Sequence, residues 1–403
     1  NTKHEKRTCC VGLEAPPRIM ASPDSRPVHA GRPGPRIEGA VPLPAFQPAT
    51  SPHETPEQPP RYIRYSDSPN HDALHDKIAA LAGTDDALVT ASGMAAISTA
   101  LLSVLDAGDH LVAPRGLYGG TLALFDTWLP RFDITHTLVD ADDRAAWEAA
   151  LQPNTTALYA ESITNPLLAV RDLEMMTDLA ESHDLASLID NTFASPVNLR
   201  PAALGFDVVL HSATKYLGGH SDLAAGAIAG PTALMDNVRE TATLLGGLLD
   251  PHACFLLHRS LKTLGVRVRQ QNETAHAVAD ALSGHRAIDR VRYPGLASHP
   301  HHDRARALLD GFGGMVSFDV LPAADLETFF EALSLPVRAS SLGGVETLIT
   351  QPVHTSHRGV APEARAALGI TDRLVRLSVG LGGTDDLVED VKTALSASLS
   401  PDA

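Results

Sequence analysis

The sequence has little cysteine, and its three cysteines are poorly placed for a structural role. Cys9 and Cys10 are adjacent and Cys254 stands alone, so the chain contains no Cys-x-x-Cys spacing. Adjacent cysteines rarely pair with each other, and cysteine zinc sites need spaced ligands. We therefore expect neither a disulfide framework nor a zinc site, which favours a reducing, cytoplasmic location.

Long hydrophobic runs and an excess of positive charge are missing too. No apolar run approaches the roughly 20 residues of a membrane helix. The basic start at residues 1–7 is not followed by the apolar stretch of a secretory signal. The 403 residues include 32 lysines and arginines against 48 aspartates and glutamates, a net charge of −16. We therefore expect neither nucleic acid nor a membrane as a partner.

A histidine-rich run at residues 299–302 is the one tempting metal site. Pro300 interrupts the run, and His299, His301 and His302 have neither helical nor strand spacing. Because metal sites need rings oriented toward one point, we predict no metal here.

The N-terminal part is rich in proline and poor in periodic apolar residues. Residues 15–60 therefore predict an extended, mostly irregular arm. Such an arm is a loose tail in a monomer and often lies on a neighbour in an oligomer, and the sequence favours neither. Met20 opens a more ordinary sequence, so residues 1–19 are expected to stand apart from the folded protein. We assign the arm to residues 1–60.

From residue 71 onward, short apolar strands alternate with helices. This alternation predicts an α/β fold with a mostly parallel sheet covered on both faces. Ligands of such sheets bind beyond the carboxyl ends of the strands. We assign this larger domain to residues 61–240. The expected strands are 87–90, 110–113, 157–160, 186–189, 207–210 and 224–229, and the expected helices are 72–82, 92–105, 144–151 and 173–183.

The remaining residues, 241–403, predict a smaller α+β domain. Its first part looks like one long helical bridge over residues 241–280. Further strands are expected at 314–320, 348–350 and 374–379, followed by a helix at 385–399.

The most informative residue is a lysine at the end of an apolar strand. Lys215 follows the apolar run that begins at Val208, and Asp190 ends another apolar run that begins at Leu185. A lysine amine binds the aldehyde of pyridoxal 5'-phosphate as a Schiff base, and a carboxylate keeps the cofactor's ring nitrogen protonated. A carboxylate without a partner near the core costs roughly several kcal/mol. The pair therefore predicts a pyridoxal-phosphate enzyme.

Two segments are candidates for holding a phosphate. Ser92, Gly93 and Met94 open a predicted helix, where free backbone N–H groups and the helix dipole favour an anion. Taken alone, this segment is better explained by an ordinary helix cap. Ser212 and Thr214, just before the lysine, add hydroxyl donors.

Four further residues have both a functional and a structural explanation. Tyr118 lies beside two glycines and either covers a cofactor ring or shapes a turn. Asn165 precedes a proline and either bonds a ring hydroxyl or carboxylate or belongs to a simple turn. Arg64 suits phosphate but is equally typical of a surface. Arg376, within an apolar strand, binds either a substrate carboxylate or a buried structural carboxylate.

Taken together, these segments resemble the Cys/Met-metabolism family of pyridoxal-phosphate enzymes, the group of cystathionine γ-synthase, cystathionine γ-lyase and methionine γ-lyase. The resemblance covers roughly residues 60–400, with the motifs in the order typical of the family. The matching segments are Ser92-Gly93-Met94, Tyr118-Gly119-Gly120-Thr121, Glu161 with Thr164-Asn165-Pro166, Asp190-Asn191-Thr192, Ser212-Ala213-Thr214-Lys215-Tyr216, Ser341-Leu342-Gly343-Gly344 and Arg376-Leu377-Ser378-Val379-Gly380-Leu381.

The resemblance implies a fold-type I architecture with a seven-stranded type of sheet, and a homotetramer built from two tight dimers. It implies that Tyr62 and Arg64 reach the cofactor phosphate of the neighbouring subunit. Tyr118 would stack on the cofactor ring and act as acid and base at the leaving group. The residues implied to hold the carboxylate side of an amino-acid substrate are Asn165, Ser341 and Arg376, and Thr192 joins the cofactor-binding set.

Several positions depart from the family pattern and leave the substrate open. Cystathionine-handling members usually have arginine at the position of Ala123 and often glutamate at that of Ser340. Methionine γ-lyases usually have cysteine at the position of Gly120, and cystathionine β-lyases have tryptophan at that of Leu342. The loop at residues 65–70 is also about one residue longer than usual. The usual Gly-Leu-Glu after the arginine strand is Gly380-Leu381-Gly382 here.

We therefore expect a cytoplasmic carbon–sulfur lyase that acts by γ-elimination on a sulfur amino acid. The alternative is a γ-replacement transferase, a cystathionine γ-synthase or an O-acylhomoserine sulfhydrylase. The two differ in whether water or a thiol completes the reaction, which the sequence does not record. A catalytically silent relative is disfavoured because Lys215, Asp190, Tyr118 and Arg376 are all present.

Overall fold

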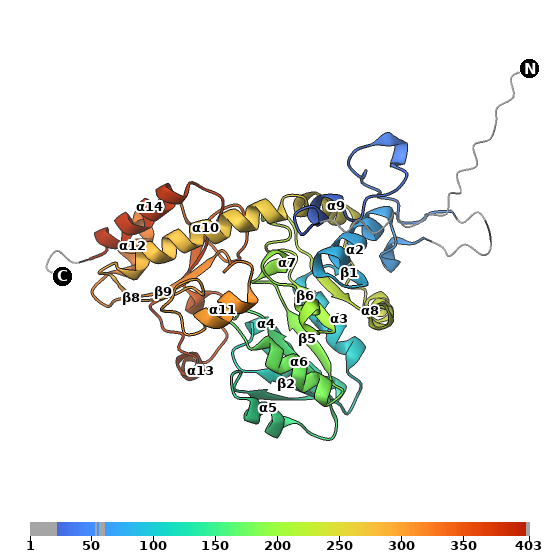
Figure 1. The fold of residues 1–403 in the computed structure, drawn as a ribbon, viewed down its shortest axis with the longest axis horizontal. Helices are drawn as coiled ribbons and strands as arrows, with labels where there is room; N and C mark the ends of the chain where they lie inside the picture. Colours follow the sequence, from blue (N-terminus) through green and yellow to red (C-terminus); the bar gives the residue numbers. More distant parts are fainter. Residues whose placement is uncertain (1–21, 53–54, 56–60, 400–403) are drawn as a thin grey trace, which may run out of the picture.

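Two β-sheets, of seven and five strands, organise the protein (Figure 1). The computed structural model describes residues 22–52, 55 and 61–399. The expectation for residues 1–19 therefore falls outside the described residues. Within the described part, no helix is both long and apolar enough to cross a membrane.

The seven-stranded sheet is mostly parallel, as predicted. Strands β3, β2, β4, β5 and β6 run parallel to one another, whereas β7 is antiparallel to both of its neighbours, β6 and β1. The strands, in their order across the sheet, are β1 (Asp86–Thr90), β7 (Gly226–Gly230), β6 (Val208–His211), β5 (Ala186–Asp190), β4 (Thr155–Glu161), β2 (His110–Pro114) and β3 (Thr135–Val139).

Helices cover both faces of this sheet, and alternate strand residues point to each face. Val209 packs into the core under α2, α6 and α9, while Val208 and Leu210 face the core under α3, α4 and α8. Short segments α7 (Ser195–Asn198) and α5 (Arg144–Ala150) complete the connections. The covering helices are α2 (Pro69–Ala82), α3 (Gly93–Val104), α4 (Gly119–Thr127), α6 (Leu173–Ser182), α8 (Thr232–Leu245) and α9 (Pro251–Leu261).

The five-stranded sheet is formed by the C-terminal part of the chain. Its core contains Val316, Phe318, Phe329 and Leu377, which α10, α12 and α14 cover. In Figure 1, α10 runs from beside the larger sheet to the smaller one. The strands in order are β10 (Val337–Arg338), β11 (Leu348–Thr350), β12 (Leu374–Ser378), β9 (Met315–Val320) and β8 (Ile288–Arg292), and the helices are α10 (Leu264–Ser283), α11 (His302–Leu308), α12 (Leu326–Ala332), α13 (Pro362–Ala367) and α14 (Thr384–Ala397).

The prediction of one helical bridge over residues 241–280 is wrong. Helix α8 ends at Leu245 because Gly246 adopts a left-handed conformation, with φ of 79°. Asp250 then caps α9, whose first residue is Pro251. Only α10 bridges the sheets. Strands β3, β8 and β10 were also missed, since their mixed polar and apolar residues give no continuous apolar run.

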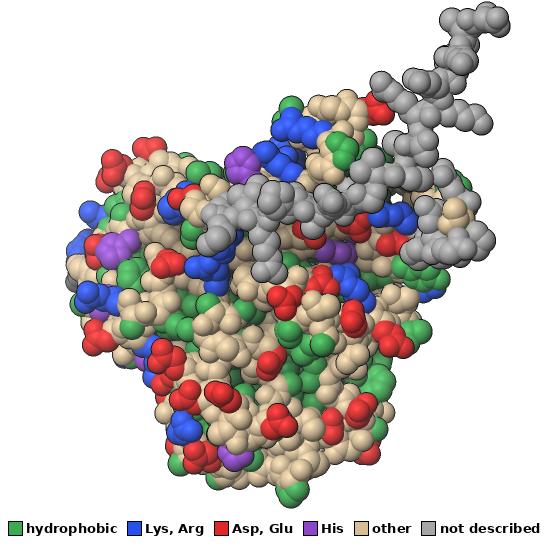
Figure 2. Space-filling view, turned by 45° about the vertical axis from the view of Figure 1, so that its right-hand side comes forward, with side chains coloured by type: hydrophobic (Ala, Val, Ile, Leu, Met, Phe, Trp, Pro, Cys, Tyr) green, Lys and Arg blue, Asp and Glu red, His purple; other side chains and the backbone are tan. Residues whose placement is uncertain are grey.

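The described part of the arm packs on its own chain. It contains the short helix α1 (Arg26–His29), and the buried Lys77 Nζ of α2 donates to the Pro27 carbonyl over 2.7 Å. Gly31 has a φ of 64° and lies so close to Ala73 that a Cβ would clash with its carbonyl. Thr50 bridges to Tyr62, which leads the chain into α2. Figure 2 shows acidic side chains spread over the visible face, in keeping with the net charge.

Candidate active site

A cavity of about 440 Å³ lies at the carboxyl ends of β4, β5 and β6, where the C-terminal part of the chain meets the larger sheet. Of the fourteen residues predicted for the site, twelve line this cavity. They come from segments spread over nearly 300 positions of sequence, so the fold itself assembles the site. The twelve are Ser92, Gly93, Met94, Tyr118, Asn165, Asp190, Thr192, Ser212, Thr214, Lys215, Ser341 and Arg376.

The start of α3 meets the segment before the lysine at very close range. Ser92 caps α3 by accepting the Ala95 N–H over 3.1 Å. A Cβ on Gly93 would lie 2.8 Å from the side chain of Ser212, so glycine is needed there. Free N–H groups of the helix start and the Ser212 hydroxyl therefore face one small space, which suits a phosphate.

Two threonines near this space are already engaged with the backbone. Thr192 Oγ1 accepts the Ser212 N–H over 2.7 Å, which joins the ends of β5 and β6. The Thr214 hydroxyl donates to the Ala225 carbonyl over 3.1 Å and accepts the Ala225 N–H over 2.9 Å. Both residues line the cavity, and their side chains fix the loop that carries Lys215.

Two carboxyl groups lie side by side at the ends of neighbouring strands. Glu161 ends β4 and Asp190 ends β5, and the two residues are direct partners in the parallel register. Asp190 accepts the Thr192 N–H over 2.9 Å, and burial raises the pKa of its carboxyl. Within the described part of the chain, neither carboxylate forms a salt bridge. Such a buried acid requires a donor from outside the chain or must hold a proton.

Glu161 was matched to the family motif, but it was given no role in the sequence analysis. Its Oε1 accepts the backbone N–H of Tyr118 over 2.5 Å, which connects β4 to the start of α4. Burial, followed by the nearby Asp190 charge, raises the pKa of Glu161 to about 8. The signal for this role was an acid that ends an apolar run, the same signal that identified Asp190.

The tyrosine ring depends on the small residue beside it. Tyr118 is 41 % exposed and lines the cavity at the start of α4. A Cβ on Gly120 would lie 2.6 Å from the Tyr118 ring and 3.0 Å from Met94 Sδ. Glycine at position 120, where methionine γ-lyases usually have cysteine, therefore lets the ring lie closer to α4 than a larger residue would allow.

Lys215 reaches across the cavity to the C-terminal part of the chain. Its Nζ donates to the Ser341 hydroxyl over 2.8 Å. Burial, and then the nearby Arg376 charge, lowers the pKa of the lysine amine. A lowered pKa increases the neutral fraction of the amine, which is the form that attacks an aldehyde or removes a proton.

Arg376 on β12 is a buried cation without a carboxylate. Its Nη1 donates to Asn165 Oδ1 and its Nη2 to the Ser341 carbonyl, each over 2.9 Å, while its Nε has no partner. Burial lowers its pKa to about 10. Among the described residues no acid forms a salt bridge with Arg376, so the structural ion pair considered from the sequence is absent there. The guanidinium is suited to a carboxylate that a ligand brings.

Tyr62 and Arg64 do not reach the cavity of their own chain. Arg64 is exposed and donates to the Thr243 carbonyl over 3.0 Å, with its guanidinium 4.8 Å from the centre of the Tyr65 ring. Several further residues line the cavity although no local sequence signal marks them. They are Ile97, Ile163, Phe193, Thr355 and Ser356.

These observations fit pyridoxal 5'-phosphate. Asp190 lacks the cationic donor that a protonated ring nitrogen would supply, Gly93 leaves room that a side chain would fill, and Lys215 presents an amine of lowered pKa. Arg376 remains free to bind the substrate's carboxylate. This chain therefore offers an acceptor for the cofactor's ring nitrogen and an amine for its aldehyde.

Comparisons with known proteins agree with this assignment. Residues 25–396 match the family model described as Cys/Met metabolism PLP-dependent enzyme. The chain is 40 % identical to a cystathionine β-lyase of Lactococcus lactis subsp. cremoris, covering 93 % of this chain and 99 % of that one. It is 39 % identical to the cystathionine γ-lyase of Bacillus subtilis, covering 91 % and 97 %.

A solved structure extends the likeness to the fold. The cystathionine γ-synthase of Xanthomonas oryzae pv. oryzae, crystallised with aminoacrylate and cysteine, has a TM-score of 0.90 at 35 % identity, covering 94 % of this chain and 98 % of that one. The predicted fold-type I architecture, with its mostly parallel sheet and second sheet, is confirmed. The chain thus belongs to the Cys/Met metabolism PLP-dependent enzymes, a family that acts on sulfur amino acids with pyridoxal 5'-phosphate as its cofactor.

Proposed function

We propose that this enzyme cleaves the carbon–sulfur bond of a sulfur amino acid by γ-elimination, releasing a 2-oxo acid, ammonia and a thiol. The observation that carries the proposal is the arrangement of Lys215 between an acid and a cation. Asp190 ends β5 beside β6, the strand that precedes Lys215, whereas Arg376 lies on β12 and bonds the carbonyl of Ser341, whose hydroxyl Lys215 reaches. A substrate whose carboxylate binds Arg376 therefore presents its α-carbon near the lysine amine.

Each residue of the site has its own role in the proposed reaction. When bound, the cofactor withdraws electron density from the substrate's α-carbon, and Asp190 maintains this by holding the ring nitrogen protonated. Lys215 Nζ takes the α-proton and delivers a proton within the substrate. Arg376 and Asn165 orient the carboxylate, with the Ser341 backbone beside them. The Tyr118 hydroxyl acts as base on the incoming amine and protonates the departing sulfur.

The cofactor's phosphate and ring are assigned to the remaining residues of the site. We propose that Ser92, Gly93 and Met94 bind the phosphate together with Ser212, with Thr192 and Thr214 fixing the loop behind it. The short contact between Gly93 and Ser212 and the cap at Ser92 support this part of the proposal.

A γ-replacement transferase is the second candidate. A transferase of this kind, a cystathionine γ-synthase or O-acylhomoserine sulfhydrylase, uses the same proton transfers and completes the reaction with a thiol. Among these transferases Ser340 favours the sulfhydrylase over the synthase, because this cavity residue replaces the glutamate often found in cystathionine-handling members. Relatives named cystathionine γ-synthase and O-succinylhomoserine sulfhydrylase also match most of the chain.

We propose a homotetramer in which each tight dimer shares its active sites, in the cytoplasm. Tyr62 and Arg64 support the sharing, since both lie outside the cavity of their own chain although they follow the arm. The buried free thiol of Cys254 is compatible with a reducing compartment. The division into an arm (1–60), a cofactor-binding domain (61–240) and a C-terminal domain (241–403) remains our proposal for the domains.

A product assay tests the function directly. Purified protein with cofactor is offered cystathionine, methionine, homocysteine and cysteine separately, and then an O-acylhomoserine with cysteine. We expect oxo acid and ammonia from at least one sulfur substrate alone. Turnover only with an acylhomoserine and a thiol together would establish the transferase instead. Retained cofactor absorbance without any turnover would identify a catalytically silent relative.

A further inference from the structure

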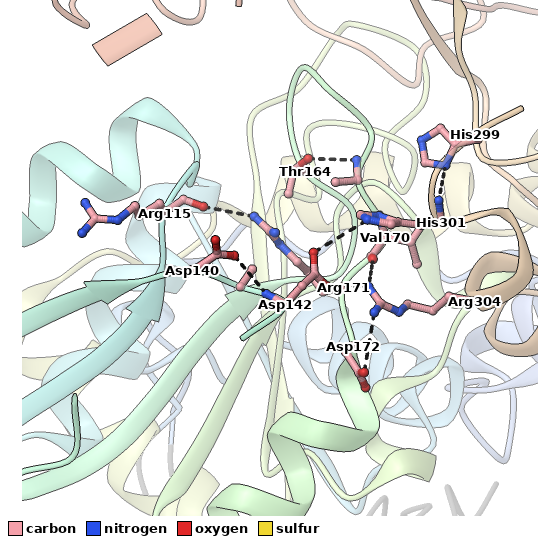
Figure 3. Close-up of polar contacts among 12 residues, drawn as sticks. Arg115, Asp140, Asp142, Thr164, Val170, Arg171, Asp172, His299, His301 and Arg304 are labelled. Atoms are coloured by element: carbon pink, nitrogen blue, oxygen red, sulfur yellow. Dashed lines mark hydrogen bonds and ion pairs between the residues drawn. The ribbon is translucent and has the colours of Figure 1, made fainter. Parts of the chain in front are cut away.

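The histidine-rich run, residues 299–302, lies away from the active-site cavity but contacts a hairpin that reaches it. Within the part of the chain that the structure describes, no group of three His, Cys, Asp or Glu is arranged to hold a metal. Instead, His301 Nδ1 lies 3.1 Å from the backbone nitrogen of Val170. Arg304, in the following helix α11, donates to the carbonyl of the same Val170 over 2.9 Å. Figure 3 shows both side chains converging on this one residue.

Val170 belongs to the hairpin of residues 162–171, which carries Asn165 into the cavity. Ile163 and Val170 form an antiparallel bridge, and Arg171 donates its N–H to the Ser162 carbonyl over 3.2 Å. At the other end of the hairpin, Asn165 Oδ1 accepts from Arg376. The hairpin is therefore held at both ends, by the histidine run outside the cavity and by Arg376 inside it.

The contact to Val170 needs a neutral histidine. A backbone N–H can only donate, so Nδ1 of His301 must carry the lone pair and accept. The proton of the neutral ring then lies on Nε2, which is 3.7 Å from Asp142 Oδ2. Protonation of Nδ1 would replace the acceptor by a second donor and remove the bond to Val170.

We propose that His301 and Arg304 are positioning residues for the substrate's carboxylate, because they hold Val170 so that Asn165 stays on Arg376. This inference rests on the proposed role of Asn165 and Arg376 as the carboxylate site. It gives the histidine run a use that its spacing along the sequence did not suggest. Neither residue touches the cofactor or the reacting atoms.

The charges around His301 set the direction of its pH dependence. Burial lowers the pKa of His301, Asp142 opposes this, and Arg304 and Arg171 reinforce it. The neutral form therefore prevails at neutral pH, and the bond to Val170 is lost as the pH falls through the lowered pKa. Asp142 also accepts a hydrogen bond from Arg304 over 2.6 Å, so the Asp142 carboxylate interacts with both Arg304 and His301. The nearby titratable groups of the run itself are His299 and His302.

The test compares binding of L-alanine with binding of L-alaninamide, which lacks the carboxylate, to the holoenzyme. Both are amines, and their apparent Kd values are read from the cofactor's visible absorbance. The Kd ratio of amide to acid reports carboxylate recognition whatever reaction the enzyme catalyses. We expect a high ratio in the wild-type protein and a ratio lower by about fivefold in His301→Leu and Arg304→Leu, from the loss of a partly buried hydrogen bond.

Two matched variants separate positioning from general damage. His301→Asn places an amide oxygen near the position of Nδ1 and cannot be protonated, so we expect a wild-type ratio at neutral pH and no loss of it that tracks histidine protonation down to about pH 5. Relative to His301→Asn, the wild-type ratio should fall as the pH drops below 6.5, toward about pH 5. Arg306→Leu changes an exposed arginine of the same helix that has no hydrogen bond or ion pair among the described residues, and it should leave the ratio unchanged. If His301→Leu does not fold, the pH dependence of the Kd ratio in wild type and in His301→Asn still tests the positioning role.

Hydrogen exchange of the peptide covering residues 162–171 provides the second measurement. Exchange should be faster in His301→Leu than in wild type, His301→Asn or Arg306→Leu. A high wild-type ratio that His301→Leu and low pH both leave unchanged would overturn the positioning role. A wild-type Kd ratio near one would overturn the proposed carboxylate site, and this inference with it. If exchange of the 162–171 peptide were also the same in His301→Leu as in wild type, His301 would not anchor the hairpin either.

Discussion

The two sides of the active-site cavity have opposite and unbalanced charge. On the side formed by the strand ends, the buried Glu161 and the partly buried Asp190 are carboxyl groups without a salt bridge among the described residues. Around Ser341, the partly buried Lys215 and the buried Arg376 are bases, and their partners are hydroxyl, amide and carbonyl oxygens. Within the described chain, no salt bridge joins the two sides across the cavity.

This separation has a clear energetic meaning. Buried charges normally pair with each other, because an unpaired one is costly. The fold instead holds the acids on one side and the bases on the other, and the pKa shifts show the cost: burial raises the pKa of the acids and lowers that of the bases. A ligand with a cationic ring and an anionic carboxylate would stabilise both sides at once.

Removing the base nearest the reacting atoms should have the largest effect. In Lys215→Ala we expect kcat to fall by about 10⁴-fold, because a positioned acid–base group typically contributes 10²–10⁴. The cofactor's Schiff-base absorbance should disappear as well. Stopped assays and a visible spectrum measure the two effects. An unchanged absorbance band would show that another amine binds the aldehyde.

The second-largest effect should come from neutralising the acid at the end of β5. Asp190→Asn retains the shape of the side chain but loses the charge that holds a protonated ring nitrogen. Loss of one partner of a buried ion pair costs about 3–5 kcal/mol, which corresponds to roughly two to four orders of magnitude in kcat. Asp184→Asn, an exposed aspartate before the same strand, is the matched control. Equal activity in the two variants would contradict the role of Asp190.

Changing the shape of the basic side should have a smaller effect. Arg376→Lys keeps a positive charge but loses the planar fork that bonds Asn165 and the Ser341 carbonyl. We expect kcat/KM to fall by about 10- to 100-fold, mostly through KM, since hydrogen bonds to charged groups contribute about 1.5–3 kcal/mol. A fall in kcat alone would place Arg376 at the reacting centre rather than at the carboxylate.

The smallest effect on activity should come from Glu161→Gln. With a pKa of about 8, Glu161 is mostly protonated at pH 7, so a neutral amide that still accepts the Tyr118 N–H should keep activity within about threefold. Its effect on stability should depend on pH. A raised pKa favours the folded state at low pH, and this contribution is lost as the pH rises through about 8.

Urea unfolding of holoenzyme at pH values from 6 to 9 measures this linkage. The wild-type free energy of unfolding should decline with pH relative to that of the variant, by an amount on the order of a few kcal/mol. Parallel curves for the two proteins would show that Glu161 is already ionised in the folded state.

The sequence predicted residues whose signal is local and missed those whose role depends on distant packing. Asp190 and Lys215 were predicted because an apolar run ends beside each of them, and the parallel sheet then places strand ends together. Spacing within the histidine run indicated no role for His301, because its partner, Val170, is 131 positions away. Likewise, Thr355 and Ser356 reach the cavity only through the packing of the C-terminal part.

The prediction of one long helix over residues 241–280 was wrong although local sequence signals for a break were present. Gly246 and the Asp250-Pro251 pair are an ordinary helix end and an ordinary helix start.

Helix α10 has a further consequence through its buried Arg267. This guanidinium donates to the carbonyls of Tyr216 and Leu217, the two residues after Lys215, over 2.7 and 3.3 Å. The Tyr216 hydroxyl in turn accepts the N–H of Gly314, just before β9. The lysine is thus held by the same helix that supports the smaller sheet. On heating, melting of the C-terminal part should release the lysine loop at once, so the enzyme should lose its cofactor spectrum in that transition even while the larger sheet persists.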